Sequence, residues 1–218
     1  GDYERANDDF NKSGETEDFI VYEFLSYAPS DNQLRQGLDN IILKNPSNSM
    51  VLYMRGLTYA HTNEWSAAWL DFNRAIELNP KLLGAYLWRS RAAQEQTGLF
   101  YDPFAIVIDL NKAFENEKYK TPCNIQNRGV AYEDAKNFDN ANKDFEEVVR
   151  LTTNEIEKDP QNAFAYYIRG LAYHSLGKYL VAFWQYVQVQ IIDPEFAQEI
   201  NAKEKMLNNL GMYKTYYF

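Results

Sequence analysis

Residues 167–183 read YIRGLAYHSLGKYLVAF, a run rich in aromatic and aliphatic side chains. Its composition suits a helix that is buried over most of its surface, yet Arg169 and Gly170 stand together inside it. A glycine within a helix costs about 1 kcal/mol relative to alanine. The arginine–glycine pair therefore needs a structural reason, and the rest of the chain supplies it.

The segment belongs to an internal repeat, which is the first pattern to look for because it decides the fold. Gly56, Tyr59, Ala68, Phe72, Ala75 and Pro80 align at identical spacings with Gly170, Tyr173, Ala182, Tyr186, Val189 and Pro194. A third copy contains Gly129, Tyr132, Ala141, Phe145 and Val148. A weaker fourth copy contains Ser90, Ala93, Ile106, Leu110 and Ala113, once four extra residues are allowed. Because several spacings recur together, the match does not depend on any single residue.

The repeat resembles the tetratricopeptide repeat (TPR) family, whose unit of about 34 residues folds as two antiparallel helices. The resemblance implies an all-α fold, a right-handed superhelix of stacked antiparallel helix pairs (an α-solenoid). We expect an acidic, poorly ordered lead-in at 1–17 and a single domain at 18–218. Within that domain we place a degenerate capping unit at 18–48, repeats at 49–82, 83–121, 122–162 and 163–196, and a C-terminal capping helix at 195–211.

Two units depart from the common length. The second carries its extra residues between its helices, in the stretch TGLFYDPF at 97–104. The third lacks a proline near Thr153 and continues to Pro160. Its seven added residues are close to two helical turns, so the apolar face stays nearly in phase. We predict an overlong second helix there, protruding from the array.

The repeat also answers the opening question. Gly56, Gly129 and Gly170 indicate close approach between the two helices of a unit. The arginine recurs in all four units as Arg55, Arg89, Arg128 and Arg169, and the facing second helices carry Asp71, Asp109, Asp144 and Gln185. We predict that each arginine binds the acidic residue of its own unit, since a guanidinium can hold a carboxylate through two hydrogen bonds. The alternative is a row of arginines that lines an anion-binding groove.

Helix ends are marked along the chain. Asp102, Thr121 and Asp193 each precede a proline, the order expected of an N-cap followed by the first helical residue. Ser30 with Gln33 forms a capping-box pair. Gly211 supplies a C-terminal stop for the last helix. For the final segment MYKTYYF, at 212–218, we expect a stretch of chain folded back onto the cap, with exchange between two chains as the alternative.

Composition excludes several function classes. A net charge of −9 argues against a nucleic-acid surface, which needs clustered Lys and Arg. Cys123 is the one cysteine, so an internal disulfide is impossible, and two histidines cannot complete a structural zinc site. No apolar run reaches the roughly 18 residues of a transmembrane segment. Phosphate-binding glycine loops and hydrolase motifs are absent, so we expect neither catalysis nor a cofactor.

In the TPR family the first helices line a concave groove that takes an extended peptide or a helix of a partner. Carried over by alignment, this peptide-binding lining comprises Met50, Tyr53, Leu57, Leu87, Arg91, Gln94, Gln126, Val130, Glu133, Phe164, Tyr167, Leu171 and His174. Tyr53 and Leu57 stand where a carboxylate clamp of the family places Lys and Asn, so that clamp is expected to be missing. The alternative is that these residues only pack between neighbouring helices, and for Tyr53 and Tyr167 both interpretations stay open.

The resemblance therefore implies a protein–protein interaction scaffold whose partner is another protein or a peptide. The apolar and aromatic lining favours an amphipathic helix or an apolar peptide over an acidic tail. A self-associating structural module, such as a homodimer, is the alternative, and a small-ligand binder is a third option. Arrays of this kind with few cysteines are common among bacterial envelope proteins. By that analogy we expect a soluble chain, with export to a bacterial periplasm or cell envelope as one option.

Overall fold

The structure is a computed structural model that describes residues 31–96 and 100–209. Several expectations fall outside these ranges: the acidic lead-in, the first helix of the N-terminal capping unit, and the cap at Ser30. The stop at Gly211, the tail at 212–218 and part of the stretch at 97–104 also lie outside them. For these segments the sequence-based expectations stay predictions.

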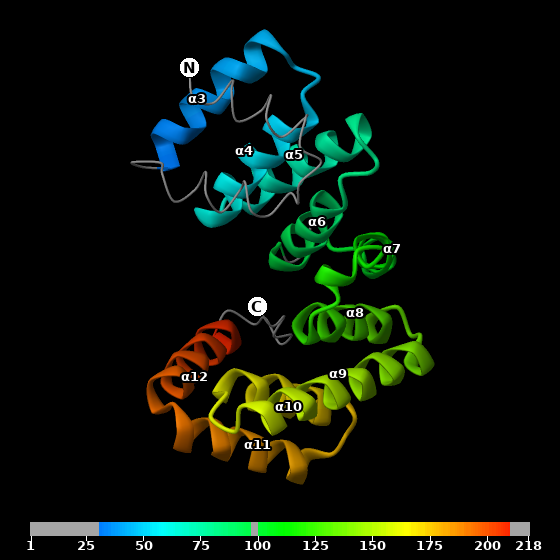
Figure 1. Cartoon of the computed structure of the whole chain (residues 1–218), viewed down its shortest axis with the longest axis vertical. Coiled ribbons are helices and arrows are strands. Elements are labelled where there is room, and N and C mark those ends of the chain that lie inside the picture. The colour runs from blue at the N-terminus through cyan, green and yellow to red at the C-terminus, as the bar shows by residue number, and fades with distance from the viewer. Residues whose placement is uncertain (1–30, 97–99, 210–218) are drawn as a thin grey trace. The chain divides into compact units, whose positions relative to one another are not determined.

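The described residues form α-helices and one short 3-10 turn, and they contain no strand (Figure 1). The helices are α3 (Asp31–Lys44), α4 (Ser49–His61), α5 (Trp65–Leu78), α6 (Leu83–Glu95), α7 (Pro103–Ala113), α8 (Pro122–Asp134), α9 (Phe138–Lys158), α10 (Ala163–Ser175), α11 (Tyr179–Ile192) and α12 (Pro194–Asn209), and the turn is η1 (Glu117–Tyr119). The all-α prediction is confirmed.

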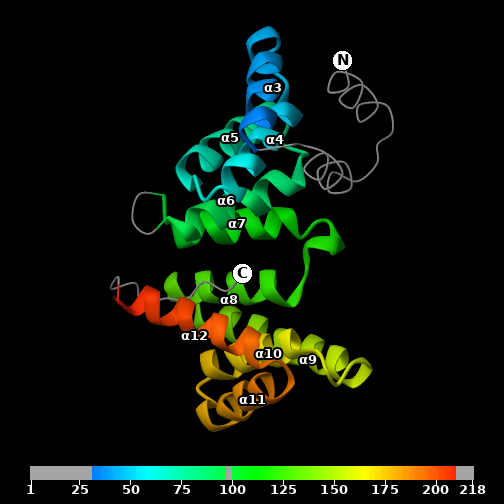
Figure 2. The same ribbon diagram turned by 90° about the vertical axis from the view of Figure 1, so that its left-hand side faces the viewer.

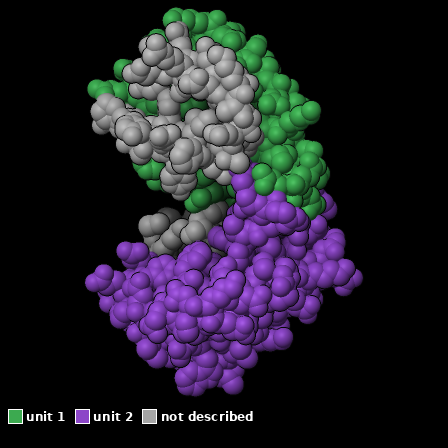
Figure 3. Space-filling model, viewed as in Figure 1, with its two compact units in different colours: residues 1–101, 108–116 green, residues 102–107, 117–218 purple. Residues whose placement is uncertain are grey.

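Contacts between Cα atoms divide the chain into two compact units (Figure 3). Unit 1 is Gly1–Tyr101 with Ile108–Asn116, and unit 2 is Asp102–Val107 with Glu117–Phe218. Within unit 1, α4 packs against α3 and α5, and α5 packs against α6. Within unit 2, each helix from α8 to α12 packs against the next, and α8 also contacts α10. The repeat boundaries and the single domain at 18–218 stay predictions.

The predicted N-caps are confirmed at all three proline-led helices. The Asp102 carboxylate accepts a hydrogen bond from the Phe104 amide at 2.9 Å, and the Asp193 carboxylate accepts one from the Phe196 amide at 2.9 Å. The Thr121 hydroxyl accepts a bond from the Asn124 amide at 3.2 Å. Each cap satisfies an amide that the first helical turn leaves without a partner.

The second helix of the third repeat is overlong, as predicted: α9 runs for 21 residues. The sequence predicts that its added turns protrude, but one side of them is covered. Thr152 and Ile156 are buried, and the Thr153 hydroxyl accepts a hydrogen bond from Arg169 of α10 at 3.2 Å. Because two added turns keep the apolar face in phase, the longer helix continues to pack on its neighbour.

The helical glycines are explained by close contact with an aromatic ring. A Cβ atom added at Gly56 would lie 2.6 Å from Cε1 of Phe72, and one added at Gly129 would lie 2.5 Å from Cε1 of Phe145. Both rings are fully buried. At Gly170 the same added atom would lie 2.6 Å from Cε1 of Tyr186. In these three repeats the second helix thus presses a ring against the first helix at a position where a Cβ atom would clash.

The arginines bridge the two helices of each unit, which confirms the structural interpretation. Arg55 donates two hydrogen bonds of 2.7 Å to the carboxylate of Asp71. Arg89 binds Asp109 at 2.9 and 2.6 Å, and Arg128 binds Asp144 at 2.8 and 2.7 Å, in the same two-bond geometry. The three carboxylates are nearly buried. Each unit with an aspartate at this position is therefore held together by a bidentate ion pair.

Three of these arginines also bind the second helix of the preceding repeat. The third nitrogen of Arg55 donates to Asp39 of α3 at 2.8 Å. Arg89 donates in the same way to Asn73 of α5 at 2.7 Å, and Arg169 donates to Thr153 of α9. The guanidinium thus joins neighbouring units as well as the helices of one unit, a role that the sequence alignment does not predict.

Burial and pairing act in opposite directions on these charges. Burial raises the pKa of Asp109 and of Asp144, because their carboxylates have lost water, and the hydrogen bonds from Arg89 and Arg128 oppose that rise. The hydrogen bond to Asp71 raises the pKa of Arg55 above its ordinary value. The paired arginines therefore stabilise the ionised form of carboxylates that burial alone would destabilise.

Candidate functional site

The predicted groove residues divide by exposure. The exposed members are Glu133, Phe164 and His174, and the half-buried members are Leu87 and Arg91. The buried members are Met50, Tyr53, Leu57, Gln94, Gln126, Val130, Tyr167 and Leu171. Most of the set therefore packs between helices in this structure. Tyr53, for example, is 0% exposed, and its ring centre lies 5.9 Å from that of Phe72. Tyr53 is therefore buried in this structure, and its role in a groove stays a prediction.

Tyr167 differs, because its ring forms part of the wall of an open pocket. The ring centre lies 6.3 Å from that of Tyr186 on α11, and it meets Phe196 of α12 edge-on at 5.8 Å. Phe164, one turn earlier on α10, lies 6.2 Å from the same Phe196 ring. These aromatic contacts fix α12 against α10 and leave a recess beside Tyr167.

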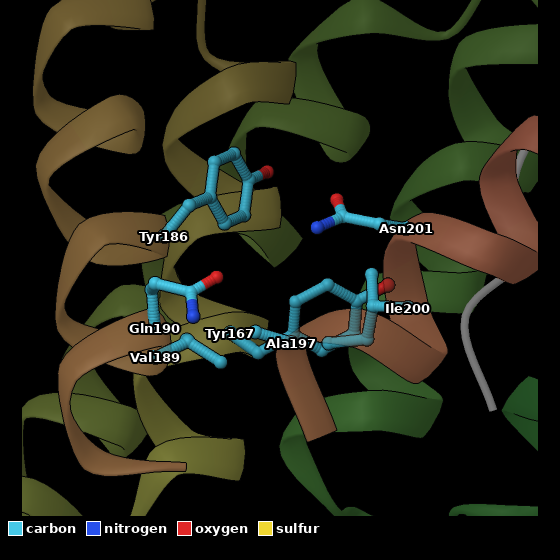
Figure 4. Close-up of a pocket in the computed structure, with 7 residues that line it drawn as sticks. All are labelled: Tyr167, Tyr186, Val189, Gln190, Ala197, Ile200 and Asn201. Atoms are coloured by element: carbon cyan, nitrogen blue, oxygen red, sulfur yellow. The ribbon is translucent and has the colours of Figure 1, made fainter. Parts of the chain in front are cut away.

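The recess, which we call the α10–α12 pocket, lies within unit 2 and has a volume of about 140 Å³ (Figure 4). Its lining comprises Tyr167 from α10, Tyr186, Val189 and Gln190 from α11, and Ala197, Ile200 and Asn201 from α12. An apolar protein cavity of about 150 Å³ holds a benzene molecule. The pocket therefore has room for one aromatic ring or one branched aliphatic side chain.

The chemistry of the lining is neutral, since none of its side chains is charged at pH 7. Val189 and Ala197 are buried apolar walls, whereas the amide side chains of Gln190 and Asn201 are exposed. Each amide offers both a donor and an acceptor, the pair of groups that a peptide backbone presents. The arrangement can hold an apolar side chain inside and bind the polar backbone of the same ligand outside.

Comparisons with known proteins bear on the fold. No family model matches the chain, and no curated protein matches its sequence. Among solved structures, YrrB, described as a TPR protein with an unusual peptide-binding site, aligns with a TM-score of 0.56 at 18% identity, covering 91% of this chain and 97% of that one. A structure of MamA aligns with a TM-score of 0.53 at 18% identity, covering 90% and 92% of the two chains. MamA from Desulfovibrio magneticus RS-1 aligns with a TM-score of 0.56 at 13% identity, covering 82% and 93%.

The chain has the TPR fold. The resemblance drawn from the sequence is thus confirmed at the level of architecture. At these identities the alignments show the fold alone.

The groove alignment includes one pocket residue, Tyr167, and omits the rest. Extending the same alignment by one repeat length of about 34 residues would have included Asn201, which occupies in the capping helix the register that Tyr167 has in α10. Gln190, in contrast, lies on a second helix, which the groove alignment does not consider. The pocket exists only because α12 docks beside α11, a tertiary contact that the repeat pattern does not encode.

Over residues 31–96 and 100–209, no group of three or more His, Cys, Asp or Glu side chains is placed to hold a metal ion. None of the TPR helices in these ranges is long and apolar enough to span a bilayer. His174 is exposed and meets the ring of Tyr179 edge-on at 5.1 Å.

Proposed function

We propose that this protein is an interaction module that binds a partner through an apolar side chain inserted in the α10–α12 pocket. The single observation that supports this most is the pocket's combination of apolar walls with two exposed amides. Ligand pockets in proteins commonly combine apolar walls with a few polar groups that fix the orientation of the ligand. The partner is a peptide or a segment of another protein.

The lining also defines which side chain fits. Burying a charged group without a partner is costly, and no lining residue of the pocket carries a compensating charge. The chain as a whole is acidic, with a net charge of −9, which further disfavours an acidic ligand. We therefore expect Leu, Ile, Met or Phe at the anchoring position, flanked by neutral or basic residues.

The exposed members of the predicted groove extend this proposal. Phe164 lies on α10 one turn before Tyr167 and is 45% exposed, so it can contact a ligand that runs on from the pocket. His174 and Glu133 are exposed on α10 and α8 of the same unit. Whether a ligand follows the remaining groove positions stays a prediction, as does export to a bacterial periplasm or envelope.

A rim substitution tests the pocket. Asn201→Trp places a bulky ring at the mouth of the α10–α12 pocket, at an exposed position where the fold tolerates it. In selections from a phage-displayed peptide library, the unaltered chain should enrich peptides that share one apolar anchor. The variant should bind those peptides about tenfold more weakly or worse, because burial of one such side chain contributes about 1.5–3 kcal/mol.

Gln198→Trp is the matched control, since it adds the same ring at an exposed α12 position outside the pocket lining. It should retain full affinity for the selected peptides. If both tryptophan variants bind as the unaltered chain does, or if the library yields only charged anchors, the proposed site is wrong.

A further inference from the structure

The helix α11 has an unusual composition for the second helix of a repeat. Its sequence, YLVAFWQYVQVQII, contains no charged residue over 14 positions. One side packs inward, where Ala182 and Val189 are buried. Its only strongly polar residues are three glutamines. A helix so rich in apolar residues is normally buried over most of its surface, yet in Figure 2 α11 lies at the edge of unit 2.

The outward side of α11 is also apolar. Its residues follow the i, i+3, i+4, i+7, i+11 spacing of a single helical stripe, which we call the α11 stripe: Leu180, Phe183, Trp184, Val187 and Ile191. Leu180 is 74% exposed, Trp184 is 58% exposed and Ile191 is 66% exposed, whereas Val187 is half-buried. A contiguous exposed apolar surface of this kind marks an interaction site.

At the corresponding positions, the other described second helices are polar or only partly apolar. In and just after α7, with the four-residue allowance, these positions are Phe104, Val107, Ile108, Asn111 and Glu115. In α9 the equivalent positions are Asp139, Asn142, Lys143, Glu146 and Arg150, all polar or charged. In α5 they are Ser66, Trp69, Leu70, Asn73 and Glu77, a mixed set. The repeat fold therefore does not require apolar residues there. Of the described second helices, only α11 is apolar at all five positions.

We infer that the α11 stripe is the interface with a second copy of this chain, packed antiparallel about a two-fold axis. Such an interface must be self-complementary, and the α11 stripe meets that condition. An axis midway between Trp184 and Val187 sets Leu180 of one chain against Ile191 of the other, and Trp184 against Val187. Phe183 lies opposite the aliphatic stem of Gln188, and the tryptophans lie near the centre of the contact, where interface energy concentrates.

Charge supports a second copy over an unrelated partner. Exposed Lys178 precedes α11, while exposed Asp193 and Glu195 follow it. The same two-fold axis sets Lys178 of one chain against Asp193 of the other, twice per dimer. Between these ends the helix is uncharged, so two chains that each carry −9 can approach there without like charges meeting. The α11 stripe excludes the residues that line the α10–α12 pocket, so peptide binding and dimerisation are separate properties.

The oligomeric state of the full chain tests the inference. Sedimentation and light scattering from about 1 µM to about 100 µM should show a mass that rises to that of a dimer. Trp184→Glu should leave a monomer over the whole range, because a carboxylate would be buried at the contact. Its helical circular dichroism and melting temperature should stay near those of the unaltered chain at low concentration, since the side chain is exposed in the monomer.

Leu70→Glu is the matched control. Leu70 occupies the same repeat position on α5 and has the same 58% exposure as Trp184, but it has polar and charged neighbours in its stripe. It should dimerise like the unaltered chain. A chain that stays monomeric at every concentration overturns the inference, as does a dimer that persists in Trp184→Glu.

The orientation has its own readout. In a Cys123→Ser background, the double variant Leu180→Cys/Ile191→Cys should oxidise to a covalent dimer, because the antiparallel register brings these positions within disulfide range. Leu180→Cys alone should not, since its two copies lie about 16 Å apart along the helices. Cross-linking of the single variant at an equal rate would contradict the antiparallel arrangement.

Discussion

Arg55→Met is expected to lower the free energy of unfolding by about 3 kcal/mol, because it leaves two carboxylates without their cation. Arg55 joins three helices: it binds Asp71 of α5 with two hydrogen bonds and Asp39 of α3 with a third. Asp71 is almost fully buried, so water cannot replace the lost partner. The urea midpoint at neutral pH measures the change, with an unaltered slope showing that the transition itself is the same.

The fourth repeat, at 163–196, provides the control for this prediction. Arg169 occupies the same position but binds the neutral side chains of Gln185 at 2.9 Å and Thr153 at 3.2 Å. Arg169→Met therefore strands no charge, and we expect a loss of about 1 kcal/mol. Equal losses for the two variants would show that packing of the arginine stem, and not its ion pair, holds the helices together.

Gly129→Ala is expected to destabilise the chain by about 2 kcal/mol, against the gain of about 1 kcal/mol that alanine normally brings to a helix. The new Cβ would lie 2.5 Å from Cε1 of Phe145 and 3.2 Å from Cβ of Asp144. Phe145 is fully buried and has no room to withdraw. The clash can be relieved only if α8 and α9 move apart, and this movement also lengthens the ion pair between Arg128 and Asp144. Thermal and urea unfolding measure the loss.

Gly170→Ala tests the same contact against a ring that is less tightly packed, because Tyr186 is only half-buried and borders the α10–α12 pocket. That ring can move, so the expected loss is smaller than at Gly129. If Gly129→Ala left the stability unchanged or raised it, close contact with the aromatic ring could not be the reason for glycine in these helices.

The sequence alone was enough for the helix pairs, and the reason is physical. Gly, Tyr, Ala and Phe recur at fixed spacings because each unit solves the same packing problem, and the bidentate pairs follow from the same register. The length of α9 followed from counting helical turns, and the caps at Asp102, Thr121 and Asp193 followed from the residue types that precede proline. These features depend on contacts within one unit.

Features that depend on neighbouring repeats could not be read from the sequence. For Tyr53 the alignment left groove lining and packing both open, because its burial depends on the rings around it. The hydrogen bonds from Arg55 to Asp39 and from Arg89 to Asn73 cross between units. The pocket beside Tyr167 depends on where α12 docks. Periodicity in one unit gives no information about these tertiary distances.

The most direct test of the proposed function is an amide NMR titration of the full chain with a peptide recovered from the library selection. We predict that the largest chemical-shift changes fall on Tyr167, Gln190 and Asn201 and on their immediate neighbours in α10, α11 and α12. These changes should disappear in Asn201→Trp. Shifts centred on other helices, or shifts that persist unchanged in that variant, would contradict binding in the α10–α12 pocket.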